Sequence, residues 1–489
     1  MSGNSFDQRT TAGLPLMPHQ HNLRHLASRR DVLQSVGAGF GVLALHGLVS
    51  DTTAAVVHRR TTNPLAELPA HHPATAKRCI FIYLPGGPSQ IDLFDPKPEV
   101  SRRHGQPLPF QMPTLVRTRT NNLHGTPFSF RKHGQSGISV SELLPNLAGC
   151  VDDICVIRSM VADNINHGGA ALQMHTGEQA FSRPSVGSWA TYGLGSQNEN
   201  LPGFVVISPK PTFQSGPLFS SSFLPAAYQG TLIRDLNNPI ADLKSKPHSQ
   251  RRQRAQIAAL RRLHELRRDR LGHVAALDAR IASFELAYRM QAEAPEAFEI
   301  ERESAHTLEQ YGIGNPETEP IGKQLLLARR LAERGVRFIQ VFDSSRGNNA
   351  WDHHNQISSK LPVNCRQTDL PIAGFLQDLK RRGLLEETLV VWGGEFGRTP
   401  TAEGADGREH HPFGFTMWLA GGGIKGGHVH GSTDDFGWHA VRDKVHIHDL
   451  HATILHTLGL NHETLTFRYG GRDYRLTDVF GRVVQEILA

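Results

Sequence analysis

Short, continuous apolar runs recur along the chain, and the first of them ends in a glycine pair. The first run, residues 79–84, is followed by Pro85-Gly86-Gly87. A continuous apolar run bounded by turn residues is typical of a strand that is buried on both faces of a parallel sheet. Further strands are predicted at residues 154–157, 203–208, 336–342, 388–392 and 416–420.

Amphipathic stretches with helical spacing lie between these runs. Helices are predicted at residues 168–175, 185–194, 323–334, 369–382 and 450–458. Alternating strands and helices favour an α/β fold with a mostly parallel central sheet and helices on both faces. Ligand sites in such sheets form beyond the carboxyl ends of the strands.

One long segment, at about residues 237–310, breaks this alternation. Apolar residues recur in it at near-helical spacing, and Arg and Glu fill many other positions; the apolar residues are Leu260, Leu263, Leu266, Leu271, Val274, Leu277 and Ile281. The pattern predicts an amphipathic helical insertion. Its arginines are interpreted as a solvated helix face in preference to a site for a polyanion.

The N-terminal segment has the pattern of an export signal. Arg29 and Arg30 precede an apolar run at residues 36–49. That run is too short to span a bilayer, and a basic pair before a short apolar run resembles a twin-arginine signal. We expect residues 1–56 to be the signal and the start of a linker, 57–74 to be linker, and 75–489 to form one domain. The protein is therefore expected in the periplasm or outside the cell, without a stable membrane span.

Composition narrows the function classes. The 489 residues carry a formal net charge of +6 with 28 histidines. No nucleic-acid-binding motif accompanies the positive charge, so a nucleic-acid partner is not expected. Of the four cysteines, Cys79 and Cys155 lie in predicted strands and are expected to be buried free thiols.

Candidate chemistry begins directly after the first strand. Ser89 and Asp92 follow Gly86-Gly87 and place a hydroxyl and a carboxylate at the strand end. Ser89 is a candidate nucleophile and Asp92 a candidate metal ligand. An Asp-rich turn that caps a helix explains the same residues equally well.

His167 stands at the predicted start of the helix at residues 168–175. A helix N-terminus exposes N–H groups and a partial positive charge, which suits an anionic substrate. His167 could act there as an acid or base near neutral pH. His175 near the helix end, and His446, His448 and His451 further on, are interpreted as mainly structural.

Carboxylates and imidazoles also follow the fourth and fifth predicted strands. Asp352 and His354 lie two residues apart, so in an extended segment they point to the same side. Glu395 and Arg398 follow the strand at residues 388–392, and His410 and His411 come soon after. Imidazole with carboxylate suits a divalent metal, zinc or manganese before calcium. The alternative is a salt-bridged Glu395–Arg398 turn and a surface histidine pair.

Several longer stretches resemble the DUF1501 family, which is bacterial and frequent in planctomycetes. They are "GGPSQIDLFDPKP", "NHGGAALQMHTGE", "RIASFELAYRMQAEAPEAF", "WDHHNQ", "GGEFGRTP" and "HDLHATILHTLGL". The resemblance implies a fold like that of the alkaline phosphatase/sulfatase superfamily. It places Glu395 at the sulfatase Asp position, Phe396 at its His or Asn position, Asp449 at the Asp of a later helix, and His167 at the nucleophile position. No Cys-x-Pro-Ser-Arg sequence is present, so sulfatase chemistry by a formylglycine nucleophile is disfavoured.

The sequence is compatible with two main functions. The first is an exported metal-dependent hydrolase of phosphate or sulfate esters, on polysaccharides among other substrates, with Arg398 binding the anionic group. The second is a non-catalytic protein that binds an anionic glycan or an envelope partner. A structural role through the insertion is a weaker third interpretation.

Overall fold

Nine strands of the described part of the chain form one twisted sheet. The structure, a computed structural model, describes residues 64–111, 122–211, 216–236, 296–343 and 350–489, and scattered positions between 255 and 289. The strand order is β12 (His428–His430), β4 (Ile154–Val161), β11 (Phe415–Ala420), β8 (Thr388–Gly393), β1 (Arg78–Tyr83), β7 (Phe338–Phe342), β5 (Phe204–Ile207) and β6 (Thr231–Ile233), and β15 (Val445–His446) also pairs with β4.

Most strand pairs of this sheet are parallel. β11 alone among them runs antiparallel, to both β4 and β8. Every residue of the central strands β1, β7 and β8 is buried. These strands are the apolar runs of the sequence, because a strand covered on both faces needs apolar side chains on both.

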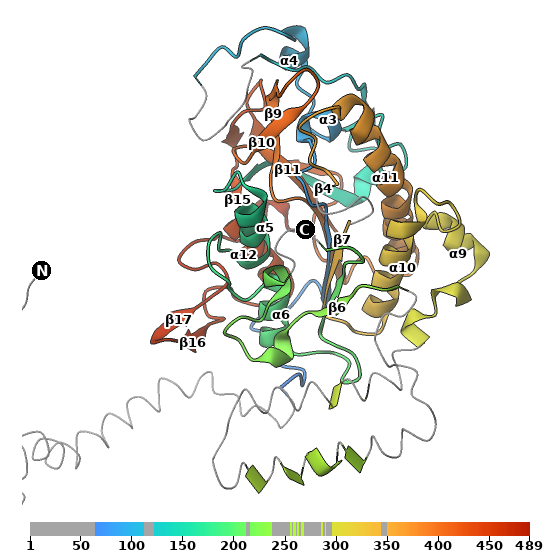
Figure 1. Cartoon of the computed structure of the whole chain (residues 1–489), viewed down its shortest axis with the longest axis vertical. Coiled ribbons are helices and arrows are strands. Elements are labelled where there is room, and N and C mark those ends of the chain that lie inside the picture. Colours follow the sequence, from blue (N-terminus) through green and yellow to red (C-terminus); the bar gives the residue numbers. More distant parts are fainter. Residues whose placement is uncertain are drawn as a thin grey trace, which may run out of the picture. The chain divides into compact units, whose positions relative to one another are not determined.

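Helices cover both faces of the sheet. α10 (Glu319–Glu333) and α11 (Ile357–Arg381) lie on one side, and α5 (His167–Thr176), α6 (Val186–Leu194) and α12 (Ile447–Thr457) lie on the other (Figure 1). The predicted fold class, an α/β fold with a mostly parallel central sheet, is confirmed.

Smaller elements decorate this core. They are the helices α3 (Gln90–Leu93), α4 (Pro98–Arg102) and α9 (Ala305–Gln310), and the two-stranded pairs β2–β3 (Phe130–His133, Ile138–Ser141), β9–β10 (Gly397–Ala402, Arg408–His411), β13–β14 (Ser432–Thr433, Ala440–Arg442) and β16–β17 (Phe467–Tyr469, Arg472–Tyr474).

Parts of the predicted organisation lie outside the described residues. These are the export signal, the first half of the linker, and most of the insertion at 237–310. The second half of the predicted linker, from Pro64, packs on the domain. The Leu65 side chain is buried, and the amides of Leu68 and His71 donate to the carbonyls of Leu194 (2.9 Å) and Gly459 (2.8 Å).

Of the helices that the structure describes, none combines the length and the apolar character that crossing a bilayer requires. The four cysteines are buried free thiols.

Candidate metal centre

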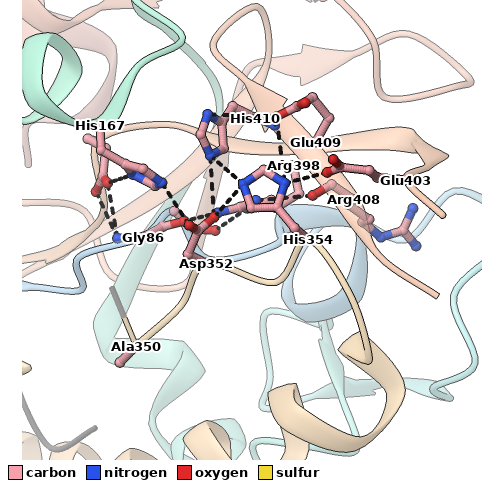
Figure 2. A network of polar contacts seen from close by, with 12 residues as sticks. Gly86, His167, Ala350, Asp352, His354, Arg398, Glu403, Arg408, Glu409 and His410 are labelled. Carbon is pink, nitrogen blue, oxygen red and sulfur yellow. Dashed lines mark hydrogen bonds and ion pairs between the residues drawn. The ribbon is translucent and has the colours of Figure 1, made fainter. Parts of the chain in front are cut away.

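Four side chains from three distant parts of the chain converge beyond the carboxyl ends of the sheet strands. His167 follows β4 and opens α5, Asp352 and His354 lie between β7 and α11, and His410 belongs to β10. Figure 2 shows the three imidazoles turned toward the Asp352 carboxylate. One ligand atom from each of the four lies within 4.8 Å of the others.

The two Asp352 oxygens receive different partners. Oδ2 lies 3.1 Å from His167 Nε2. Oδ1 lies 2.9 Å from His354 Nε2 and 3.3 Å from His410 Nε2. The two Nε2 atoms of His354 and His410 are themselves 3.0 Å apart. Three imidazole nitrogens and a carboxylate therefore face one small volume.

The opposite nitrogen of each imidazole is held by an acceptor. His410 Nδ1 lies 2.6 Å from the Ile165 carbonyl oxygen, and His167 Nδ1 lies 2.6 Å from Glu395 Oε1. His354 Nδ1 contacts Glu403 Oε2. A carbonyl or carboxylate oxygen only accepts, so each Nδ1 carries a proton, and each Nε2 can offer its lone pair whenever its imidazole is neutral. Metal-binding histidines are typically oriented in this way.

Burial and hydrogen bonding shift the pKa values of the histidines of the cluster in opposite directions. Burial lowers the pKa of His410 to about 4, which keeps its imidazole neutral. Burial opposes charge on His167, but hydrogen bonds to Asp352 and Glu395 raise its pKa to about 9. Burial also disfavours the Asp352 carboxylate, yet hydrogen bonds from His167 and His354 and the nearby Arg398 guanidinium hold its pKa well below the usual range. A divalent cation among these atoms would supply the positive charge that protons supply without it.

The cluster is open on one side. The side chains of His354 and Asp352 are 31% and 19% exposed, so water and a small ligand can reach them. His410 and His167 are more enclosed, at 14% and 10%.

Glu395, predicted as a metal ligand, lies behind His167 instead of beside the other ligands. Its carboxylate accepts from His167 Nδ1, from the Tyr83 hydroxyl at 2.8 Å and from the Gly86 amide at 3.0 Å. The side chain is 1% exposed. With these three donors on its oxygens, Glu395 orients His167.

Arg398, predicted to bind the anionic part of a substrate, has no exposed surface. Its Nε donates to the Gly87 carbonyl (3.0 Å) and its Nη1 to the Arg408 carbonyl (3.0 Å). Its Nη2 contacts Asp352 Oδ1 at 2.5 Å and the Gly86 carbonyl. Arg398 thus fixes Asp352 and the loop after β1, and the structure does not place it where a substrate anion could reach it.

Ser89 and Asp92 form a separate buried group. The Ser89 hydroxyl donates to Asp92 at 2.5 Å, and Arg408 Nε lies 2.8 Å from the same carboxylate. Ser89, Asp92 and Arg408 are all fully buried. The predicted nucleophile Ser89 and metal ligand Asp92 therefore do not join the cluster, and their role beside α3 is an internal ion pair.

Of the adjacent histidines His410 and His411, only the first faces the cluster. Successive side chains of a strand point to opposite faces. His411 is buried on the other face of β10, where its Nε2 lies 2.6 Å from the Trp438 carbonyl oxygen.

Two glutamates of the site were not predicted. Glu403 stands at the turn of the β9–β10 hairpin, and Glu409 lies in β10 with its Oε1 3.8 Å from His354 Nδ1. Together with His354 they form a second group of possible ligand atoms. Glu409 precedes the His410–His411 pair directly, so the sequence alone could have identified it as a candidate ligand. Only the hairpin pairing brings Glu403 to His354.

Backbone packing holds the segment of Asp352 in place. Gly86 has a φ of +116°, and a Cβ atom there would lie 2.5 Å from the Asp352 amide nitrogen. The Trp351 amide donates to the Pro85 carbonyl (3.1 Å), and the Arg408 amide donates to the His353 carbonyl (3.0 Å). Glycine is required at residue 86 because two backbones touch there.

A mostly parallel α/β sheet with these side chains beyond its strand ends defines an α/β protein with a candidate metal centre. The sequence profile of a family described as "Protein of unknown function (DUF1501)" matches residues 76–488. The chain belongs to this family, as its motifs predicted. No curated protein matches it.

Solved structures give matches at low similarity. They include the lipoteichoic acid synthase LtaP from Listeria monocytogenes, at 10% identity and a TM-score of 0.35 over 81% of this chain and 77% of that one. The PsFucS1 sulfatase from Pseudoalteromonas sp. matches at 12% identity and 0.31, over 78% and 68%. The phosphonate monoester hydrolase SpPMH from Silicibacter pomeroyi matches at 12% and 0.30, over 71% of each chain. We draw no functional argument from likenesses at these TM-scores.

Proposed function

We propose that this protein is an exported, metal-dependent hydrolase of phosphate or sulfate esters, with polysaccharide esters among its substrates. The observation that carries the proposal is the convergence of three imidazole Nε2 atoms on Asp352, with every Nδ1 held by an acceptor. The choice of ester is supported by the sulfatase-like sequence around His167 and Glu395. Export is supported by the Arg29–Arg30 pattern.

A divalent metal held by His167, Asp352, His354 and His410 would supply a Lewis acid that lowers the pKa of water and polarises an ester oxygen. The protein's own contribution is to fix these ligands. Glu395, the Ile165 carbonyl and Glu403 hold the three Nδ1 protons. Arg398 holds Asp352 Oδ1. Water is the nucleophile that this site supports best, since Ser89 is buried and its hydroxyl is donated to Asp92.

The number of ligands bears on which metal fits. Zinc in proteins is usually four-coordinate, and catalytic zinc sites commonly keep one of the four positions for water. Four protein ligands would fill a tetrahedral zinc site, whereas a six-coordinate ion such as manganese would retain two positions. Of the two metals favoured by the sequence, manganese therefore fits a hydrolase better, and zinc would have to expand its coordination.

The test measures metal binding and turnover on the same samples. Metal-free protein is loaded with manganese or zinc, and its metal content and its hydrolysis of 4-nitrophenyl phosphate, bis(4-nitrophenyl) phosphate and 4-nitrophenyl sulfate are measured. We expect one metal per chain and turnover of at least one ester. Asp352→Ala and His354→Ala should each weaken metal binding and lower the rate of ester hydrolysis by at least about 100-fold. His439→Ala, which removes an exposed histidine that is not part of the cluster, is the matched control.

Each other outcome has a defined meaning. Absence of a bound metal would contradict both the site and the function. A metal bound without hydrolysis of any ester would leave the site standing and favour the non-catalytic alternative.

A further inference from the structure

A groove separate from the metal centre lies along the C-terminal end of α5. It encloses about 300 Å³ between α5, the start of α12, and the β16–β17 hairpin with the turn that follows it. In Figure 1 the hairpin lies on the same side of the sheet as α5, α6 and α12. The volume is at the lower end of the range of roughly 300–1,000 Å³ for small-molecule sites, which suits one or two rings.

Aromatic rings form two walls of this groove. On one wall Phe223 lies beside Tyr474, with ring centroids 5.0 Å apart. Tyr469, which does not line the groove, stacks on Phe223 at 5.0 Å and 16°. On the other wall Phe480 stacks on His448 at 5.2 Å and 6°. Phe480 is 57% exposed, so its ring is accessible to a ligand from solvent.

Unusual backbone conformations present these rings. Ser222, just before Phe223, has a φ of 46°, and Asp478, two residues before Phe480, has a φ of 48°. Residues other than glycine seldom adopt this left-handed conformation, and such residues concentrate at binding sites. Gly177 at the end of α5 forms part of the groove, and a Cβ atom there would lie 2.4 Å from the Leu476 carbonyl oxygen.

Polar groups between the walls are suited to hydrogen-bonding hydroxyl groups. The lining includes the exposed carboxamide of Gln179, the carboxylate of Asp163 and the guanidinium of Arg183. The Gln173 carboxamide also lines the groove, but it is buried and hydrogen-bonded to Asp163. The Arg183 guanidinium lies 4.4 Å from the centroid of the Tyr474 ring. Amides and carboxylates supply donors and acceptors within the same groove as the rings.

The charges around the groove are balanced. Arg468 pairs with Asp473 at 3.0 Å, Arg482 with Glu486 at 3.2 Å, and Arg472 with Asp478. Such a surface gives little attraction to a polyanion or an anionic membrane. Exposed rings with balanced polar groups select instead an uncharged ligand that has an apolar face and a polar rim.

We propose that this groove binds a neutral sugar ring of a glycan chain. A pyranose presents a face of C–H groups that stacks on aromatic rings and a rim of hydroxyls that hydrogen-bonds to amides and carboxylates. The groove does not depend on the proposed function, although a polysaccharide hydrolase would benefit from a second contact with its substrate.

Affinity gel electrophoresis of the full chain tests this inference. The gels contain xylan, galactan, mannan or β-glucan as neutral polymers, with dextran sulfate as the polyanion, at about 0.3 M salt to screen exposed charges. We expect retardation by at least one neutral polymer. Tyr474→Ala with Phe480→Ala, which removes a ring from each wall, should weaken it about tenfold or more. Tyr474→Phe keeps the ring and should bind, as should the control Val441→Ala outside the groove, which replaces a side chain that is 58% exposed.

Several results would overturn the inference. One is that no neutral polymer retards the protein, and another is that dextran sulfate alone retards it. A third is that the doubly substituted variant is retarded as strongly as the unsubstituted protein while its thermal unfolding is unchanged. Co-sedimentation with anionic phospholipid vesicles without sugar binding would identify a membrane surface instead. His354→Ala should leave retardation intact, so a failure of the catalytic proposal is distinguishable from a failure here.

Discussion

Asp352 is the residue on which the candidate metal centre depends. Both of its oxygens are shared by the three histidines, and Arg398 holds Oδ1 from behind at 2.5 Å. The sequence predicted that Asp352 and His354 lie together, because residues two positions apart in an extended segment point to the same side. It did not predict the roles of Glu395 and Arg398, since spacing along the chain cannot tell a ligand from a residue that orients one.

Glu395→Gln should weaken metal binding by about 10–100-fold without removing a ligand. The amide keeps the size of the side chain but loses the charge that holds the His167 Nδ1 proton, and its NH2 group opposes the Gly86 amide or the Tyr83 hydroxyl. Titration calorimetry with manganese measures the effect. Glu387→Gln, at a surface pair with Lys77, is the matched control. If Glu395→Gln and Glu387→Gln bind manganese with equal affinity, Glu395 does not orient His167 for metal binding.

Arg398→Met should destabilise the fold by about 3–5 kcal/mol, because it leaves Asp352 and two loop carbonyls without their buried partner. Urea unfolding of the metal-free protein measures this change. Arg366→Met removes an arginine that is 55% exposed and should cost no more than about 1 kcal/mol. Unchanged stability of Arg398→Met together with a raised KM for an ester would restore the predicted anion-binding role.

At the scale of elements, the strands were predictable and the hairpins were not. Continuous apolar runs identified β1, β4, β5, β7, β8 and β11, because burial on both faces leaves a strong signal. α11 begins at Ile357, twelve positions before the predicted start at 369, and contains Pro362 and Pro371, which a sequence-based prediction treats as helix breakers. The β9–β10 hairpin is made mostly of polar side chains and has no apolar period, so the sequence gives no strand signal there.

The contact between α5 and α12 predicts a sensitivity to acid. His451 in α12 is fully buried with its Nε2 2.7 Å from the Met174 carbonyl oxygen, and burial lowers its pKa to about 3. The unfolded chain, with an ordinary histidine pKa of 6.5, then binds the proton more readily between pH 6.5 and 3. The stability that the neutral His451 contributes is therefore fully present above pH 6.5 and is lost as the pH drops from 6.5 toward 3.

His451→Gln keeps a donor for the Met174 carbonyl and removes the proton-binding group. The slope of unfolding free energy against pH between 6 and 4 should become shallower by up to about 1.4 kcal/mol per pH unit. Urea unfolding at a series of pH values measures the slope. His439→Ala, which removes an exposed histidine, should leave it unchanged. An identical slope in His451→Gln would show that this histidine is not held neutral.

At the scale of the whole molecule, the metal centre would connect segments that are far apart in the chain. His167, the Asp352–His354 pair and His410 belong to three parts of one large unit, residues 62–489. The sequence predicted that strand ends would gather such residues at one edge of the sheet. The aromatic groove was not predicted, because Phe223, Tyr474 and Phe480 show no regular spacing along the chain.

Because the ligands are dispersed, a bound metal should stabilise the entire fold. Free metal at about 100 times its dissociation constant should raise the free energy of unfolding by about 2.7 kcal/mol, provided that the unfolded chain does not bind it. Thermal unfolding with manganese and with a chelator measures the difference. Asp352→Ala should show no such shift. A shift of equal size in that variant would locate the metal elsewhere.

The most direct test of the metal centre is anomalous X-ray diffraction at the manganese edge from crystals grown with manganese. We predict one anomalous peak within coordination distance of His167 Nε2, His354 Nε2, His410 Nε2 and an Asp352 oxygen. A map without a peak there, or with its only peak between Glu403 and Glu409, would contradict the account.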